Sequence, residues 1–188
     1  MLPGTTIIIS PLIALMHDQM RAASAVGIRA ATLTSADDDR YETMQRFRKG
    51  ELDLLYVAPE RASGMEFRAL LREGHIALFA IDEAHCVSEW GHDFRPDYRL
   101  LRPLMDDFDH VPRLALTATA DAHTRSDILA QLGISEDGLI VAGFDRPNIR
   151  YAIEPKAGPV TQIADFIRGN AGAGIVYAQS RAAVDSLA

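Results

Sequence analysis

A run of six apolar residues, Ile76–Ile81, leads directly into two adjacent carboxylates, Asp82 and Glu83. The run offers no polar position that could face water, and it is far shorter than the roughly 18 residues that a membrane span needs. A strand without polar alternation is buried on both faces, which is typical of a parallel sheet covered by helices on either side. The run therefore favours a layered α/β fold.

Similar short apolar runs recur along the chain and alternate with segments of helical spacing. We expect strands at residues 5–10, 30–33, 52–57, 76–81 and 113–116, and helices at residues 12–25, 41–48, 67–72 and 121–132. Strands that alternate with amphipathic helices predict a doubly wound parallel sheet.

A turn-rich segment, FDRPN at residues 144–148, divides the chain into residues 1–145 and residues 146–188. It follows a short expected strand at 139–141, and beyond it the pattern restarts. We expect strands at 149–153 and 174–177, a helix at 160–168 and another helix from Ser180. About 40 residues are fewer than a core usually needs to hold by itself. Residues 146–188 are therefore expected to open a second α/β domain.

Composition narrows the class of protein further. The 188 residues carry 19 Lys plus Arg and 26 Asp plus Glu, a net charge of −7, which argues against a chain that coats nucleic acid without specificity. A local basic groove is compatible with this net charge, because the net charge is summed over the whole chain and binding is local. The single Cys excludes a disulfide framework or a multi-cysteine zinc site within these residues and fits a reducing compartment. A secretory signal requires Lys or Arg near its start, and the chain has neither before Arg21. No apolar stretch is long enough for a membrane span.

The carboxylates Asp82 and Glu83 are the strongest chemical signal. Ligands of open α/β sheets bind at the carboxyl ends of the strands. One carboxylate there can hold Mg²⁺ on a nucleotide, and the next can orient and deprotonate an attacking water. An acidic pair alone is better explained as a solvated pair at the start of a helix, where acids are favoured. The apolar strand before the pair and Ala84-His85 after it favour the catalytic interpretation.

The sequence around this pair resembles a known family. Residues 82–85 have the form of the DEAH motif, and CVSEWGHDFRPDY at 86–98 resembles the aromatic-rich loop of RecQ-type DNA helicases. Five more blocks resemble motifs of that family in the same order: residues 10–19 (motif Ia), 56–61, 115–120 (motif III), 144–149 and 175–181 (motif IV). The resemblance covers essentially the whole chain, and so many ordered blocks make chance agreement implausible.

This resemblance implies an incomplete RecA-like doubly wound sheet, followed by the start of a second RecA-like domain, in an enzyme that uses ATP and Mg²⁺. Asp82 would bind the Mg²⁺ of ATP and Glu83 would be the catalytic base. His85 would link the nucleotide site to the elements that sense DNA. Thr117 and Thr119, at a strand end, would form part of the cofactor site and face the DNA path.

A further set of residues is implied in DNA contacts: Ser10, Arg61, Trp90, His92, Phe94, Arg95 and Arg181. Bases stack on aromatic faces at about 1–3 kcal/mol each, and Arg adds phosphate contacts. Ser10 precedes a helix N-terminus, which can receive a phosphate.

Several of these residues have simpler interpretations. Isolated aromatics such as Trp90 and Phe94 are most often core residues, although their Gly, Pro and charged neighbours favour a loop here. Ser10 with Pro11 is a good helix start whatever the function. Residues 117–119 could be a strand end without a task. Cys86 is expected to be a small buried packing residue and not a nucleophile.

The chain contains no G-x-x-x-x-G-K-[ST] loop, which in the family precedes the strand that here begins at Thr5. We therefore expect Met1 to be an internal residue or a cut end, and the arginine finger and later motifs to lie beyond Ala188. Removal of an arginine finger alone costs about 10³–10⁵ in the rate of phosphoryl transfer. The 188 residues alone are expected neither to hydrolyse ATP nor to unwind DNA. The strand that carries the G-x-x-x-x-G-K-[ST] loop is central in sheets of this kind, so its absence should leave an open groove with unpaired main chain and exposed apolar surface. The 188 residues should therefore be marginally stable and prone to aggregate.

The expected parent activity is ATP-driven 3′–5′ translocation on single-stranded DNA with duplex unwinding in recombination and repair. The expected partners are single-stranded and duplex DNA, single-strand-binding protein and other repair proteins, with no membrane. The expected location is the cytoplasm, at the nucleoid.

Three other functions compete with this one. The first is a non-catalytic nucleic-acid-binding or regulatory protein derived from a helicase. The second is a helicase that acts on RNA, against which the segment at 90–98 argues. The third is a metal-dependent hydrolase built on Asp82, Glu83, His85 and His92, which no HExxH motif or cysteine pair supports.

Overall fold

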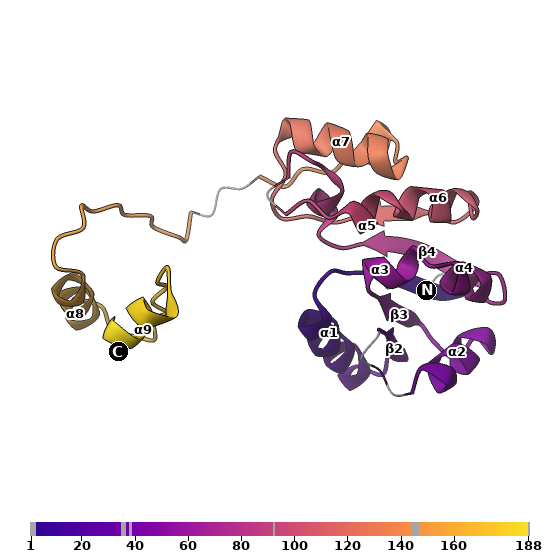
Figure 1. Cartoon of the computed structure of the whole chain (residues 1–188), viewed down its shortest axis with the longest axis horizontal. Coiled ribbons are helices and arrows are strands. Elements are labelled where there is room, and N and C mark those ends of the chain that lie inside the picture. Colours follow the sequence, from indigo (N-terminus) through magenta and orange to yellow (C-terminus); the bar gives the residue numbers. More distant parts are fainter. Residues whose placement is uncertain (1–2, 35–36, 38, 92, 144–146, 188) are drawn as a thin grey trace. The chain divides into compact units, whose positions relative to one another are not determined.

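The computed structural model describes residues 3–34, 37, 39–91, 93–143 and 147–187. The chain divides into two compact units, Met1–Ile140 and Val141–Ala188 (Figure 1). The division falls slightly before the boundary expected after residue 145. The turn-rich segment on which that expectation was based begins at residues 144–146, which lie outside the described residues.

A parallel sheet of five strands in the order β2-β3-β1-β4-β5 forms the centre of the first unit. The strands are β1 (Thr5–Ile9), β2 (Ala30–Leu33), β3 (Leu54–Val57), β4 (Ile76–Ile81) and β5 (Arg113–Ala115). Each strand lies within two residues of its expected bounds, and the predicted α/β class is confirmed. Ile9 at the end of β1 stands opposite both Val57 of β3 and Ile81 of β4. The central strands therefore end at the same level and deliver the residues that follow them to one edge.

Helices connect the strands, as the sequence pattern predicts (Figure 1). In the first unit they are α1 (Ile13–Ala25), α2 (Arg40–Arg48), α3 (Pro59–Ala62), α4 (Met65–Leu71), α5 (Pro96–Arg99), α6 (Leu101–Asp106) and α7 (Ala122–Leu132). Short 3₁₀ turns occupy η1 (Ala84–Val87) and η2 (Glu136–Gly138). Helices α3, α5 and α6 pack against one another, and both α5 and α7 pack against η1.

Alternate residues of the strands face two separate apolar clusters, as expected for a sheet covered on both sides. Ile7 and Ile9 of β1 belong to the larger cluster, which includes Phe47 of α2. Ile8, between them, packs in a smaller cluster with Met16 of α1. Helix α1 thus covers one face, and α2 helps to cover the other.

The sheet is less well covered at β5, one of its two edge strands. Leu114 within β5 is 41% exposed, and Leu116 just after it is 50% exposed. Burying apolar surface stabilises a protein by about 25 cal/mol per Å². Two half-exposed leucines at the edge of the sheet therefore contribute little to folding stability and favour aggregation through the unpaired edge. The exposed apolar surface agrees with the expectation, but the expected open groove is wrong, because the described strands pair into one continuous sheet.

The second unit contains helices α8 (Pro159–Gly169) and α9 (Arg181–Leu187) but none of its expected strands in the described residues. The predictions of strands at 149–153 and 174–177, and of a short strand at 139–141, are therefore wrong. Their apolar residues are exposed: Ile140 92%, Tyr151 82%, Ile153 99% and Ile175 79%. A strand requires a hydrogen-bonded neighbour, and these segments pair with none in the described structure.

Candidate active site

The ends of β1 and β4 bring Ser10 and Asp82 together. The hydroxyl of Ser10 donates to Oδ2 of Asp82 at 3.1 Å, and the main-chain N–H of Asp82 donates to the carbonyl of Ile9 at 2.9 Å. Ser10 is fully buried, whereas Asp82 is half-buried. The predicted DNA contact Ser10 therefore lies beneath the carboxylate, where its hydroxyl orients Asp82.

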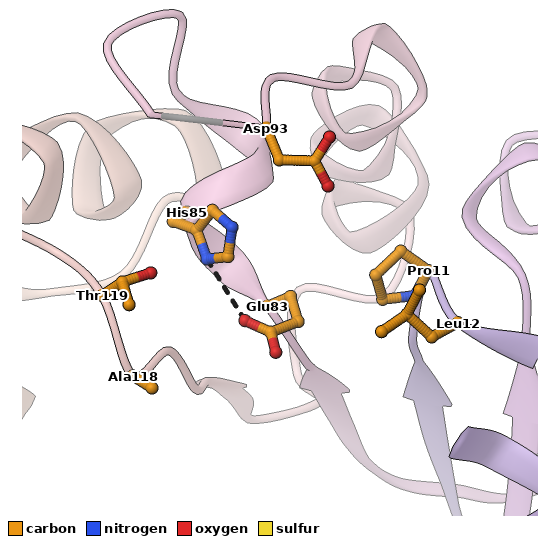
Figure 2. A pocket seen from close by; sticks show the side chains of 7 residues that line it. All are labelled: Pro11, Leu12, Glu83, His85, Asp93, Ala118 and Thr119. Atoms are coloured by element: carbon orange, nitrogen blue, oxygen red, sulfur yellow. Dashed lines mark ion pairs between the residues drawn. The ribbon is translucent and has the colours of Figure 1, made fainter. Parts of the chain in front are cut away.

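Glu83 adopts an unusual main-chain conformation. Its φ of 48° and ψ of 44° are left-handed, and it is the non-glycine residue with positive φ among the described residues. Such a conformation costs an L-residue about 1–2 kcal/mol and is typical of functional sites, where surrounding contacts enforce it. The conformation ends the strand abruptly and turns the Glu83 side chain toward His85 (Figure 2).

His85 connects the ends of β4 and β5. Its Nδ1 lies 3.2 Å from Oε2 of Glu83 and 3.0 Å from Oγ1 of Thr117. The imidazole is buried, and Glu83 is half-buried. Thr117 Oγ1 also accepts from the main-chain N–H of Thr119 at 3.3 Å. The structure thus brings together four residues that the sequence assigned to the nucleotide site, Glu83, His85, Thr117 and Thr119.

These side chains border a cavity of about 260 Å³ at the carboxyl edge of the sheet. It is lined by Pro11, Leu12, Glu83, His85, Asp93, Ala118 and Thr119. Figure 2 shows the Glu83–His85 pair in the middle, with Ala118 and Thr119 on one side and Pro11 and Leu12 on the other. The cavity therefore lies where ligands of open α/β sheets bind.

The aromatic segment at residues 90–95 lies beside this cavity. Trp90 is 72% exposed, so its interpretation as a core aromatic is wrong, and its ring contacts His123 of α7 edge-on at 5.0 Å between centroids. Phe94 is half-buried beneath the guanidinium of Arg99, 5.2 Å from the ring centroid. An added Cβ at Gly91 would lie 2.5 Å from the carbonyl oxygen of His85, so the main chain packs directly on η1.

Arg95 ties this segment to the loop after β1. Its guanidinium donates to Oδ2 of Asp93 at 3.0 and 3.2 Å and to the carbonyl of Pro11 at 3.4 Å. The hydrogen bond with Asp93 raises the pKa of Arg95 above its ordinary value. Arg95 therefore joins two residues that line the cavity, Asp93 and Pro11, through a charged guanidinium.

Other predicted site residues are not brought to the cavity. Arg61 lies on α3, half-buried, and its Nε is buried without a hydrogen-bond partner. Arg181 begins α9 in the second unit and is exposed. His92 lies outside the described residues.

Sequence reasoning missed two residues of the site, Asp93 and Tyr98. Asp93 lines the cavity and pairs with Arg95, and the spacing of the two opposite charges was a usable signal. The hydroxyl of buried Tyr98 donates to the main-chain carbonyl of Asp82 at 2.9 Å, which no sequence pattern indicates. Cys86 is buried as expected, and burial raises the pKa of its thiol to about 11.

The described residues contain no group of three or more His, Cys, Asp and Glu side chains that could hold a metal ion by themselves. His92, on which the metal-dependent hydrolase would also rest, lies outside the described residues. None of the described helices has the length and apolar character that a transmembrane span requires.

Comparison with known proteins agrees with this geometry. The family model described as DEAD/DEAH box helicase matches residues 2–128. The chain therefore belongs to the DEAD/DEAH box helicase family, as the resemblance of its motifs predicts.

Within that family its relatives are RecQ helicases. The ATP-dependent DNA helicase RecQ of Pasteurella multocida is 44% identical over 188 residues, covering 98% of this chain and 30% of the relative. The RecQ helicase of Bacillus subtilis is 39% identical and is covered to 32%, and the RecQ-like DNA helicase BLM of Xenopus laevis is 38% identical and is covered to 15%. The chain thus spans about a third or less of the length of these relatives.

A solved structure supports the fold. The helicase domain of Pyrococcus furiosus Hef superposes with a TM-score of 0.55 at 14% sequence identity, covering 72% of this chain and 28% of that one. The similarity confirms the RecA-like helicase architecture expected for the sheet.

Proposed function

We propose that this chain supplies the first motor domain of an ATP-dependent DNA helicase of the RecQ type. The observation that carries the proposal is the arrangement at one edge of the sheet. Asp82, supported by Ser10, stands beside Glu83, which pairs with His85, and His85 in turn pairs with Thr117. Gly91, which follows the exposed Trp90 in the chain, packs on the carbonyl of His85. A nucleotide site and a surface for bases are thereby adjacent.

The residues present fit Mg²⁺ delivered on a nucleotide. Asp82 offers hard carboxylate oxygens and Ser10 a hydroxyl at the same strand ends. Mg²⁺ prefers oxygen ligands and is usually held by one or two carboxylates together with water and substrate phosphates. When bound, it would neutralise charge that develops on the transferred phosphoryl group.

Glu83 is suited to be the general base. Its carboxylate lines the cavity and lies 3.2 Å from His85 Nδ1, so its position is fixed while it remains half-exposed to the cavity. From there it can orient a water and accept its proton. The His85–Thr117 hydrogen bond holds the imidazole and ties the base to the strand end of β5.

The exposed ring of Trp90 is suited to stack on a base of single-stranded DNA. Its main-chain N–H is held by the hydroxyl of Ser88 at 3.2 Å, and its indole leans on His123. A platform fixed in this way loses little conformational entropy on binding.

Finer features of the function are part of the proposal, and they rest on the resemblance of the motifs to the RecQ family. These are 3′–5′ translocation coupled to unwinding in recombination and repair, the use of single-stranded and duplex DNA, and contacts with single-strand-binding protein and other repair proteins at the nucleoid of the cytoplasm. The 188 residues contain no G-x-x-x-x-G-K-[ST] loop to hold phosphates, so we propose that by themselves they do not turn over ATP.

DNA binding by the chain tests the proposal. A labelled oligo-dT should bind with an affinity that falls about fivefold to a hundredfold in Trp90→Ala, because one base loses about 1–3 kcal/mol of stacking. Phe166→Ala removes an exposed aromatic of the second unit and is the matched control, with no comparable loss expected. Equal binding by all three proteins would refute the role of Trp90. Tighter binding to oligo-U than to oligo-dT would favour a helicase that acts on RNA.

A further inference from the structure

The turn that carries Asp82 and Glu83 is held at each of its main-chain polar groups. The N–H of Asp82 donates to Ile9, that of Glu83 donates to the side chain of Asp82, and that of Ala84 donates to Leu116, all at 2.9 Å. The carbonyl of Glu83 accepts a bond from within η1 at 2.9 Å. These bonds attach the turn to the strand ends of β1 and β5 and to η1.

One bond of this turn comes from a side chain outside it. The carbonyl of Asp82 accepts from the hydroxyl of Tyr98 at 2.9 Å. This carbonyl belongs to the peptide that sets φ of Glu83, and that angle is 48°. A left-handed non-glycine residue persists only where its surroundings over-determine it. The Tyr98 bond is therefore one of the contacts that keep Glu83 in its position.

Tyr98 is suited to this task. Its side chain is fully buried in the larger apolar cluster, with the hydroxyl as its polar group. Burial raises the pKa of the phenol well above its ordinary value, so that the hydroxyl is always available to donate. A buried hydroxyl that loses its partner is strongly unfavourable, which keeps the bond closed.

Tyr98 also continues the aromatic segment. Its N–H donates to the carbonyl of Arg95 at 3.0 Å, and the N–H of Arg95 donates to the carbonyl of Cys86 at 2.9 Å. Residues three apart share one side of a helical turn, so a shift of Arg95 is carried to Tyr98. The same short helix, α5, therefore touches the exposed aromatic segment at one end and the Asp82–Glu83 peptide at the other.

We propose that Tyr98 is a positioning residue for Glu83. Its hydroxyl fixes the Asp82–Glu83 peptide and mechanically joins that peptide to the segment containing Trp90 and Arg95. When single-stranded DNA contacts this segment, the resulting displacement is transmitted to Glu83 through α5. This last step rests on the function proposed above for Trp90 and Glu83, whereas the positioning of the peptide does not.

Tyr98→Phe removes the hydroxyl and keeps the ring. Amide hydrogen exchange at Glu83 and Ala84 should become about fivefold faster in this variant, as expected for the loss of one intramolecular hydrogen bond. Thr5→Val is the matched control, since it removes a buried hydroxyl-to-carbonyl bond of 2.8 Å to Leu52 at the opposite end of β1. It should leave exchange at Glu83 and Ala84 unchanged. Equal exchange at these two amides in Tyr98→Phe and the unaltered chain would overturn the proposal.

Transmission is tested in the same proteins with oligo-dT. In the unaltered chain the oligonucleotide should change the fluorescence of Trp90, the chain's single Trp, and shift the amide resonance of Glu83. In Tyr98→Phe the fluorescence change should persist while the Glu83 shift is lost, an outcome that a general loss of stability does not produce. A Glu83 shift that persists in full would overturn transmission through Tyr98.

The positioning of Glu83 by Tyr98 and the transmission from Trp90 are refuted by different results. If oligo-dT leaves Trp90 fluorescence unchanged in the unaltered chain, the proposed function of Trp90 and the transmission fall, while hydrogen exchange still decides whether Tyr98 positions Glu83. If Tyr98→Phe does not fold, the unaltered chain decides instead. A slowly exchanging Tyr98 hydroxyl proton with a nuclear Overhauser effect to the Glu83 amide would support the bond, and its absence would refute it.

Discussion

Removing the hydroxyl of Ser10 measures how strongly the two central strands support the carboxylate of Asp82. The Ser10 hydroxyl is fully buried and donates to Asp82 at 3.1 Å. A hydrogen bond to a charged group contributes about 1.5–3 kcal/mol. Because Asp82 is half-exposed and also accepts from the N–H of Glu83, we expect the lower end of that range, about 1.5 kcal/mol.

A double-mutant cycle isolates this bond. Ser10→Ala, Asp82→Ala and the double variant are unfolded in urea and followed by far-UV circular dichroism, and the coupling energy should be about 1.5 kcal/mol. The hydrogen bond from the main-chain N–H of Glu83 to the Asp82 side chain does not enter the coupling energy, because Asp82→Ala removes it both with and without Ser10. Thr5→Val with Asp82→Ala is the control, because Thr5 lies at the other end of β1, five residues before Ser10 and about 16 Å from it, where effects are additive. A Ser10–Asp82 coupling below about 0.5 kcal/mol would refute the reasoning.

Three further predictions concern the loop, the edge strand and acid stability. Gly91→Ala places a Cβ 2.5 Å from the carbonyl oxygen of His85, so it should lower the free energy of unfolding by about 1–3 kcal/mol. It should also weaken the binding of oligo-dT. An unchanged free energy of unfolding and unchanged binding would contradict the close packing of Gly91 on His85. Leu114→Lys places a charge on the exposed edge strand β5, so light scattering should show less aggregation at equal protein concentration. Unchanged aggregation would refute the claim that this edge causes it. Hydrogen bonds from Arg29 hold the pKa of Asp53 at about 2 instead of 3.8, so this pair stabilises the fold above pH 4 and the contribution is lost as the pH falls toward 2. In Arg29→Gln the carboxyl of Asp53 should titrate nearer 4 by nuclear magnetic resonance, and a pKa that stays near 2 would refute this assignment.

Much of the first unit could be predicted from the sequence because its signals are local. Continuous apolar runs such as Ile76–Ile81 can be satisfied only by burial on both faces, and the structure places the five runs predicted between residues 5 and 116 in the sheet. The position of Asp82 and Glu83 follows from the end of such a run. The grouping of Glu83 with His85 and Thr117 depends on two strand ends meeting, and the motif resemblance supplied what periodicity could not.

The failures have physical causes of two kinds. Residues 149–153 and 174–177 have strand-like composition, but a strand exists only with a partner, and these segments have none in the described structure. Ser10 and Tyr98 show the second kind. Their hydroxyls are committed to partners 72 and 16 residues away, and a single sequence contains no signal for such tertiary hydrogen bonds.

The most direct test of the central claim is ATP hydrolysis in a helicase that carries this chain in place of its own equivalent segment. The RecQ helicase of Pasteurella multocida is suitable, since the aligned segment spans 98% of this chain at 44% identity. We predict ATP hydrolysis that single-stranded DNA stimulates and that Glu83→Gln lowers by about 10²–10⁴, the usual contribution of a general base. Stimulated hydrolysis that survives Glu83→Gln unchanged would contradict the assignment of this site.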